Sequence, residues 1–304
     1  MFGEFRNAFD RHNNAHVQLI IINVVVYFLI VIPFVLLTWT GYSSLFGVIE
    51  KIFLLPPRFI DFLSRPWTLI TYAFGHDWQG VWHIIGNMLA LYWFGKLFIE
   101  YLGNDKLIAV YVLGALAGGI VYLLAFNSIP FFIGRAVFPG LVGASAAVFA
   151  VMMAIVTLIP DYTFFLLFLG PVKIKYIALF YIVVSFIGTI GANDGGNIAH
   201  LGGLLMGFIY TKQLQAGVNW GGWITSTLDF IKGLFKPSPN VKVTYRKTEP
   251  SRKTTTTTNG GKPKQSFNKA TQEEIDAILD KISDKGYESL SKEEKEKLFN
   301  ASKK

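Results

Sequence analysis

Long apolar runs separated by short polar segments fill most of the first 235 residues of this 304-residue chain. The first run, residues 17–39, contains no charged residue and has the roughly 20 residues that a helix needs to cross a bilayer. Five further runs lie at residues 80–101, 106–127, 143–160, 174–192 and 198–217, and the fourth run is on the short side. Because backbone polar groups in lipid must be satisfied within the segment, the pattern predicts an all-α membrane protein with six transmembrane helices.

Two shorter amphipathic patterns flank these runs. Residues 40–79 carry apolar residues at helical spacing, interrupted at Pro56 and Pro57, which is typical of short helices that lie in the membrane interface. Residues 218–236 carry a similar apolar stripe. This stripe predicts an interfacial amphipathic helix, with a dimer contact as the alternative.

The two ends of the chain are polar. Residues 1–16 form a polar arm, and residues 237–270 are rich in Pro, Thr and Lys, which predicts a disordered linker. In residues 271–304 a capping pattern from Thr271, a glycine at Gly286 and a second cap at Ser291 predict a small helical hairpin. The apolar stripe of this hairpin could bind a protein partner or the membrane domain, or form only a small core.

Charge and composition refine the membrane interpretation. Most of the net charge of +8 lies in the tail, where the positive-inside bias and anionic lipid account for it without a nucleic-acid partner. Lysines at positions 96, 106, 173, 175 and 212 place both termini in the cytoplasm, although basic residues in the first loop weaken this signal. Residues 17–39 are too long for a signal peptide and predict a retained anchor. The absence of cysteine excludes disulfides, iron–sulfur clusters and thiol catalysis.

Candidate chemistry begins at Ser145, which lies among small residues at the start of the fourth run. A packing role is the plain interpretation, because serine and small residues let membrane helices approach closely. His200 near the start of the sixth run favours a functional role, since ionisable residues within a membrane are rare and usually functional. Small residues recur every fourth position in both runs: Ala146, Ala150 and Ala154 in one, and Ala199, Gly203 and Gly207 in the other. We therefore expect the two helices to pack together and to bring a nucleophile, Ser145, to a base, His200.

A second polar pair lies in the second run. His83 and Asn87 are spaced i,i+4, so they share one helix face and could both donate to a developing oxyanion. Interhelical hydrogen bonding is the alternative. A metal site made of His76, His83 and His200 is a third possibility, disfavoured because the chain has no tight ligand pair such as H-E-x-x-H.

No third group that would orient His200 is evident in the sequence. Asp194 is six residues away in a loop and is expected to be solvated. Phe149 is expected to pack against the imidazole. The sequence therefore predicts a Ser-His dyad and no triad.

Taken together, these motifs resemble the rhomboid family of intramembrane serine proteases, over about residues 17–217. Gly143-Ala144-Ser145 matches the family pattern G-x-S-G, with Ala146 in place of the final glycine. The stretch from Ala199 through His200 to Gly207 matches A-H-x-x-G-x-x-x-G, and His83 with Asn87 matches H-x-x-x-N. The entry to the second run is also similar to the family's, at Trp67, Thr71, Phe74, Gly75 and His76.

The resemblance implies a six-helix rhomboid-like bundle that hydrolyses peptide bonds in or near transmembrane helices of its substrates. Ser145 would be the nucleophile, and His200 the general base and acid. The oxyanion hole would comprise His83, Asn87 and the Ser145 amide, with Gly143, Phe149 and His76 in support. The resemblance implies no cofactor and no metal, a bacterial inner membrane, and a tail similar to that of some bacterial relatives.

Two positions depart from the family pattern. The methyl group of Ala146 is expected where the substrate backbone approaches, and Phe149 stands where many relatives have tyrosine. The alternatives to an enzyme are an inactive relative that binds transmembrane clients, and a transporter. A transporter predicts inverted repeats and broken helices, and the sequence has no clear internal repeat. The presence of both Ser145 and His200 favours the enzyme.

Overall fold

The computed structural model describes residues 14–135, 140–166, 169–235 and 272–302. The chain divides into two compact units, Met1–Pro239 and Asn240–Lys304. The predicted linker, residues 237–270, lies outside the described residues, as do Thr271 and residues 1–13 of the polar arm.

Six long helices of the first unit lie where the apolar runs predict them. They are α2 (Ala15–Trp39), α6 (Val81–Leu102), α7 (Asn104–Ser128), α9 (Ser145–Leu158), α10 (Ile174–Gly188) and α11 (Asp194–Gln215). By length and composition, α2 and α7 are long and apolar enough to cross a membrane, and α9 and α10 are shorter apolar helices. The mostly helical fold is confirmed, and the count of six spans stays a prediction.

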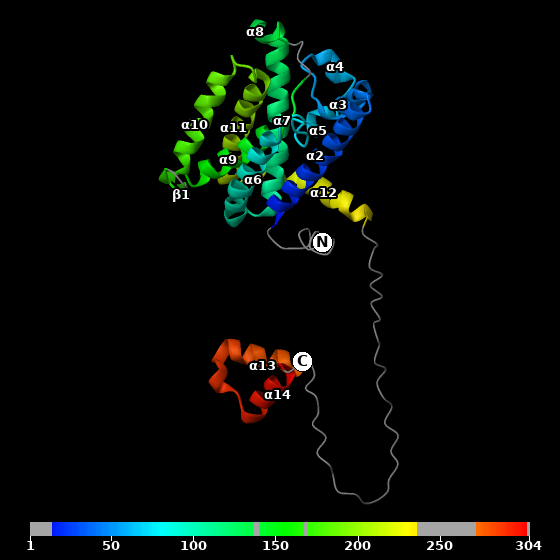
Figure 1. Ribbon diagram of the computed structural model, residues 1–304. Helices are drawn as coiled ribbons and strands as arrows, with labels where there is room; N and C mark the ends of the chain where they lie inside the picture. The colour runs from blue at the N-terminus through cyan, green and yellow to red at the C-terminus, as the bar shows by residue number, and fades with distance from the viewer. Residues whose placement is uncertain (1–13, 136–139, 167–168, 236–271, 303–304) are drawn as a thin grey trace, which may run out of the picture. The chain divides into compact units, whose positions relative to one another are not determined.

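Helix α7 occupies the centre of the first unit, and both α9 and α11 pack against it (Figure 1). Helix α10 lies at one edge of this unit, and α2 lies on the opposite side of α7 (Figure 1). Buried hydroxyl groups crosslink the core: Tyr72 donates to the Ala115 carbonyl at 2.6 Å and Tyr111 to the Ala73 carbonyl at 3.0 Å. These bonds satisfy polar groups that would be costly to bury unpaired.

Short helices fill the connections of the first unit. They are the 3-10 helix η1 (Ser43–Phe46), α3 (Gly47–Phe53), α4 (Phe59–Leu63), α5 (Thr68–Thr71) and α8 (Pro130–Ile133). The short helices expected within residues 40–79 are therefore present, and their place at a membrane surface stays a prediction. Helix α12 (Gly222–Phe235) follows α11, within the residues 218–236 for which an amphipathic helix is predicted.

A small antiparallel hairpin before α10 is absent from the sequence predictions. Strand β1 (Thr163–Leu166) pairs with β2 (Gly170–Lys173), and Thr163 lies opposite Lys173. The exposed Asp161 carboxylate accepts hydrogen bonds from Lys175 at 2.7 Å and from Lys173 at 3.0 Å. Both ammonium groups lower the pKa of Asp161. Because Lys173 ends β2 and Lys175 lies in α10, the Asp161 carboxylate links the hairpin to the start of α10.

The described part of the second unit is a helical hairpin. It comprises α13 (Gln272–Lys285), the 3-10 helix η2 (Tyr287–Ser289) and α14 (Lys292–Ser302). Gly286 follows α13 with a φ of +75°, a conformation that favours glycine after a helix. The predicted cap of α14 is present: Ser291 Oγ accepts from the Glu294 N–H at 3.2 Å, and the Glu294 carboxylate accepts from the Ser291 N–H at 2.7 Å. That backbone donor and the Lys281 ammonium lower the pKa of Glu294.

Candidate active site

Backbone hydrogen bonds fix the segment that leads into Ser145. Leu55 and Leu141 form a two-bond antiparallel bridge, with N–H to carbonyl distances of 3.0 and 2.9 Å. The Gly143 N–H donates to the Tyr72 carbonyl at 2.9 Å. Helix α9 begins at Ser145 immediately afterwards. The position of this hydroxyl is therefore set by the 54–72 region as well as by its own helix.

Gly143 lies between two of the predicted site residues, His83 and Ser145. Its φ of +138° favours glycine, and a Cβ built there would lie 2.9 Å from His83 Cε1 and 3.0 Å from His83 Nε2. The same Cβ would lie 3.6 Å from Ser145 Oγ. A side chain at this position would thus enter the space that the imidazole and the hydroxyl share.

The tautomer of His83 follows from its backbone contact. The Asp77 N–H donates to His83 Nδ1 at 3.4 Å, so the proton of the neutral ring is on Nε2, the nitrogen beside Gly143. Asn87, one turn further along α6, is 9% exposed and donates one amide hydrogen to the His83 carbonyl at 2.8 Å. Its second amide hydrogen can donate elsewhere. The two side chains are therefore both donors.

The N-terminus of α9 adds a further donor. Ser145 is the first residue of this helix, so its backbone N–H has no acceptor within the helix. The partial positive charge at a helix N-terminus also favours an anion there. Together with His83, which also lies beside Gly143, the Ser145 amide can stabilise negative charge near Ser145 Oγ.

His200 lies in the second turn of α11, and its imidazole stacks on Phe149. The ring centroids are 4.3 Å apart and the planes are inclined by 23°, as expected from the sequence. Phe149 is four residues after Ser145 on α9, so the imidazole lies over the first turn of that helix. Among the described residues, no hydrogen bond joins Ser145 Oγ to His200. Such bonds often tighten only when substrate binds.

Close packing of α9 against α11 brings together the helices that carry Ser145 and His200. A Cβ on Gly203 would lie 2.1 Å from the Ala146 carbonyl oxygen, and one on Gly207 would lie 2.2 Å from that of Ala150. No side chain larger than hydrogen fits at either point. The predicted contact between the small residues of the fourth and sixth runs is confirmed.

Ser185 is a partner of His200 that the sequence reasoning missed. Its Oγ lies 3.3 Å from His200 Nδ1, and the side chain is only 2% exposed. No third group that would orient His200 was evident in the sequence, and the structure places Ser185 beside this imidazole. The available signal was a small hydroxyl in an otherwise apolar stretch of α10.

Asp194 also differs from expectation. It was expected to be solvated, but it is 5% exposed and its carboxylate lies 3.0 Å from Arg135 Nε. It also accepts from the Gly195 N–H at 2.7 Å. This partly buried ion pair joins the residues after α8 to the first turn of α11, where a negative charge is favourable. Arg135 is far from Asp194 in sequence, so no local pattern pairs them.

The methyl group of Ala146 does not face the space beside Ser145. Ala146 is 1% exposed, and a Cβ on Gly118 would lie 2.5 Å from the Ala146 methyl carbon. The methyl group is therefore directed at α7. The expectation that it meets the substrate backbone is wrong.

His76 is fully buried in the loop before α6, and its ring meets that of His83 edge-on at a centroid distance of 5.4 Å. It thus packs against the ring of His83. Within the part of the chain that the structure describes, no group of three His, Cys, Asp or Glu side chains is arranged to hold a metal ion.

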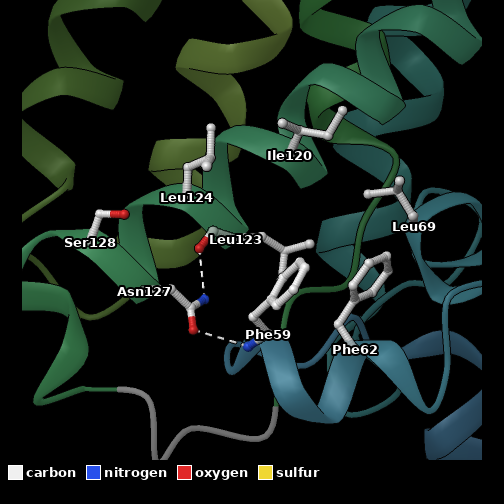
Figure 2. A pocket seen from close by; sticks show the side chains of 8 residues that line it. All are labelled: Phe59, Phe62, Leu69, Ile120, Leu123, Leu124, Asn127 and Ser128. Carbon is white, nitrogen blue, oxygen red and sulfur yellow. Dashed lines mark hydrogen bonds between the residues drawn. The ribbon is translucent and has the colours of Figure 1, made fainter.

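An apolar groove of about 340 Å³ lies between α4 and α7, apart from these residues (Figure 2). Asn127 closes one end: its side chain accepts from the Phe59 N–H at 3.0 Å and donates to the Leu123 carbonyl at 2.7 Å. None of the predicted site residues lines this groove. Its lining comprises Phe59, Phe62, Leu69, Ile120, Leu123, Leu124, Asn127 and Ser128.

Comparison with known proteins gives two family matches. Residues 63–216, just over half of the chain, match the Rhomboid domain, and residues 266–304 match a family of unknown function, DUF6576. RHOMBOID-like protein 12, mitochondrial, of Arabidopsis thaliana is 35% identical over 164 residues, which cover 51% of this chain and 48% of that protein. Rhomboid protein 1, mitochondrial, of Saccharomyces cerevisiae is 30% identical over 181 residues, which cover 53% and 49%. The chain spans about half the length of the curated relatives it matches.

Proposed function

The chain belongs to the rhomboid family of membrane proteins, which includes serine proteases, and on that premise we propose that it is an intramembrane serine endopeptidase. The observation that supports the proposal is the placement of three groups relative to Gly143 and Phe149. Ser145 Oγ and the Nε2–H of His83 flank Gly143, and His200 stacks on Phe149 one turn along the same helix. These are the nucleophile, the anion donor and the base that acyl transfer needs.

In the proposed reaction, Ser145 Oγ attacks the carbonyl carbon of the scissile peptide bond and its proton passes to His200 Nε2. The tetrahedral intermediate then collapses: the C–N bond breaks and the departing amine takes the proton from Nε2. Water next attacks the acyl-enzyme, giving a proton to Nε2, and the C–O bond to Ser145 breaks as Oγ regains that proton. The products are two peptides, and the enzyme returns to its starting state.

The oxyanion formed in each half of the reaction would be held by donors that are already in place. We assign this role to the His83 Nε2–H, the Asn87 amide and the Ser145 backbone N–H. Donors fixed before the reaction act strongly in a site of low dielectric constant, because they need no reorganisation as charge develops. Gly143 supports this arrangement by leaving the space beside His83 free.

The substrates we propose are proteins with transmembrane helices. A helix hides its peptide bonds, so the substrate must unwind locally before Ser145 can attack. Glycine or proline near the cleavage site favours unwinding, since both lower helix stability. We further propose that both termini are cytoplasmic and that the protein resides in a bacterial plasma membrane. The matched relatives carry mitochondrial and chloroplastic names, so this location needs its own test.

The test uses the full chain reconstituted in liposomes with a panel of single-span substrates. Wild-type protein is expected to cleave at least one substrate at a defined bond. A fluorophosphonate, which reacts with activated serines, is expected to label Ser145 in the wild type and to leave the Ser145→Ala variant unlabelled. Binding of single-span proteins without cleavage or labelling would instead favour the second candidate, an inactive relative that binds transmembrane clients.

His83→Ala is expected to lower kcat by about 10²- to 10³-fold, which is typical of the loss of one oxyanion donor, with little change in KM. The measurement is steady-state cleavage in liposomes. His16→Ala is the matched control, because it removes another buried imidazole, beside Tyr92 at a centroid distance of 5.7 Å. An equal effect of both substitutions on kcat would refute the oxyanion role of His83.

A further inference from the structure

Helix α10 touches the proposed site through one narrow stripe. Its buried residues are Ile174, Ala178 and Ser185, whose spacings of four and seven place them on one side of the helix. The remaining surface of α10 is largely exposed, as its place at the edge of the unit shows (Figure 1). Ser185 is thus the only buried polar side chain among the described residues of this helix.

The hydroxyl of Ser185 faces a catalytic group rather than the backbone of its own helix. Among the described residues its side-chain partner is His200 Nδ1, at 3.3 Å. A second polar contact lies close by, where the Asn197 amide of α11 donates to the Gly188 carbonyl at 3.1 Å. The ring of Tyr181 on α10 also meets Phe149 edge-on at 5.1 Å. From Tyr181 to its C-terminal end, α10 is therefore in contact with both the His200 imidazole and the Phe149 ring that stacks on it.

We propose that Ser185 is a positioning residue that holds His200 in its active tautomer. This inference rests on the proposed function. His200 can accept the Ser145 proton on Nε2 only if the ring proton is on Nδ1. In that tautomer Nδ1–H donates to Ser185 Oγ, and the Ser185 hydroxyl hydrogen is free to turn toward a carbonyl of its own helix.

The same hydrogen bond strengthens during the reaction. When Nε2 takes the Ser145 proton, the ring becomes a cation and its Nδ1–H becomes a better donor to Ser185. Ser185 thus stabilises the imidazolium more than the neutral ring, which is the condition for an effect on rate. The neutral Ser185 hydroxyl stabilises the imidazolium more weakly than a carboxylate would.

The proposed hydrogen bond also makes the state of His200 depend on the position of α10. Because the bond joins α10 to His200, displacement of α10 from α11 removes the Ser185 acceptor. The ring proton of His200 is then no longer held on Nδ1. The activity of the Ser-His pair therefore depends on α10 being in its observed place.

The test compares Ser185→Ala, Ser185→Thr and Thr189→Val in the full chain in liposomes. Ser185→Ala is expected to lower kcat about tenfold, the worth of one hydrogen bond, with KM within about twofold of the wild type. Ser185→Thr keeps a hydroxyl and should restore most of the rate. Thr189→Val removes a hydroxyl at the C-cap of α10 whose hydrogen bond, among the described residues, goes to the Phe186 carbonyl at 2.7 Å, and it should leave kcat unchanged.

A spectroscopic readout separates tautomer control from a structural role. In protein with ¹⁵N-labelled histidine in micelles, the His200 nitrogen shifts should report mainly Nδ1–H in the wild type, and a mixture or mainly Nε2–H in Ser185→Ala. This measurement decides the matter even if the threonine variant fails to fold. Unchanged kcat, or unchanged shifts, in Ser185→Ala would overturn the inference. An inactive, unlabelled wild type would instead overturn the proposed function.

Discussion

Replacing His200 by alanine should lower kcat by about 10⁴- to 10⁶-fold, almost as much as Ser145→Ala, and the double variant should be no slower than either single one. The physical reason is that the two side chains perform one step. Without the imidazole, Ser145 keeps its proton and is a poor nucleophile, and without the hydroxyl the imidazole has nothing to activate. Removing the second side chain therefore lowers kcat no further.

The measurement is turnover of one single-span substrate in liposomes by the wild type, both single variants and the double variant. Ser128→Ala provides the control, because it removes a hydroxyl from the groove between α4 and α7, away from the site. Its kcat should equal that of the wild type. Independent effects that multiply in the double variant would show that Ser145 and His200 act in separate steps, and the dyad would have to be abandoned.

Much of the fold could be predicted because each long helix coincides with one apolar run. Helix α9 begins at the residue that the motif selected, Ser145, and the small residues predicted its contact with α11. The stacking of Phe149 on His200 also followed, since a side chain four residues beyond Ser145 lies on the same face of the helix. These features depend on spacing along one helix, which a sequence states directly.

The partners of His200 and Asp194 could not be predicted, because they depend on how separate helices are rotated. In a soluble helix, polar residues mark the exposed face. In lipid the exposed face is apolar as well, so periodicity does not say which side of α10 faces the bundle. The hydroxyl of Ser185 marked a polar position in α10, but no sequence pattern assigned it to His200, and none paired the distant Arg135 with Asp194. The direction of the Ala146 methyl group was missed for the same reason.

The hairpin of β1 and β2 was missed for a different reason. Each strand has only four residues, and the second includes Pro171, which lowers the strand tendency. The lysines that bind Asp161, at the end of β2 and the start of α10, hold the second strand in place. Short elements of this kind are set by contacts with neighbours rather than by a pattern of their own.

Gly203→Ala should lower the free energy of unfolding by about 3 kcal/mol or more, as the overpacking of a tight interface does at its severe end. The added Cβ would lie 2.1 Å from the Ala146 carbonyl oxygen, which is backbone and cannot turn aside. The two helices must separate by more than a side-chain adjustment. Since Ser145 and His200 lie on these helices, their alignment should be lost together with stability.

Gly86→Ala is the matched control, because a Cβ at this position of α6 would meet nothing within 4 Å. Alanine is a better helix former than glycine, so this variant should be stabilised by about 0.5–1 kcal/mol. The two glycine substitutions should thus have effects of opposite sign in unfolding titrations in mixed micelles. Fluorophosphonate labelling of Ser145 should fall strongly in Gly203→Ala and persist in Gly86→Ala. Wild-type stability and labelling in Gly203→Ala would mean that α9 and α11 do not approach as closely as described, and the geometry that supports the dyad would fail with them.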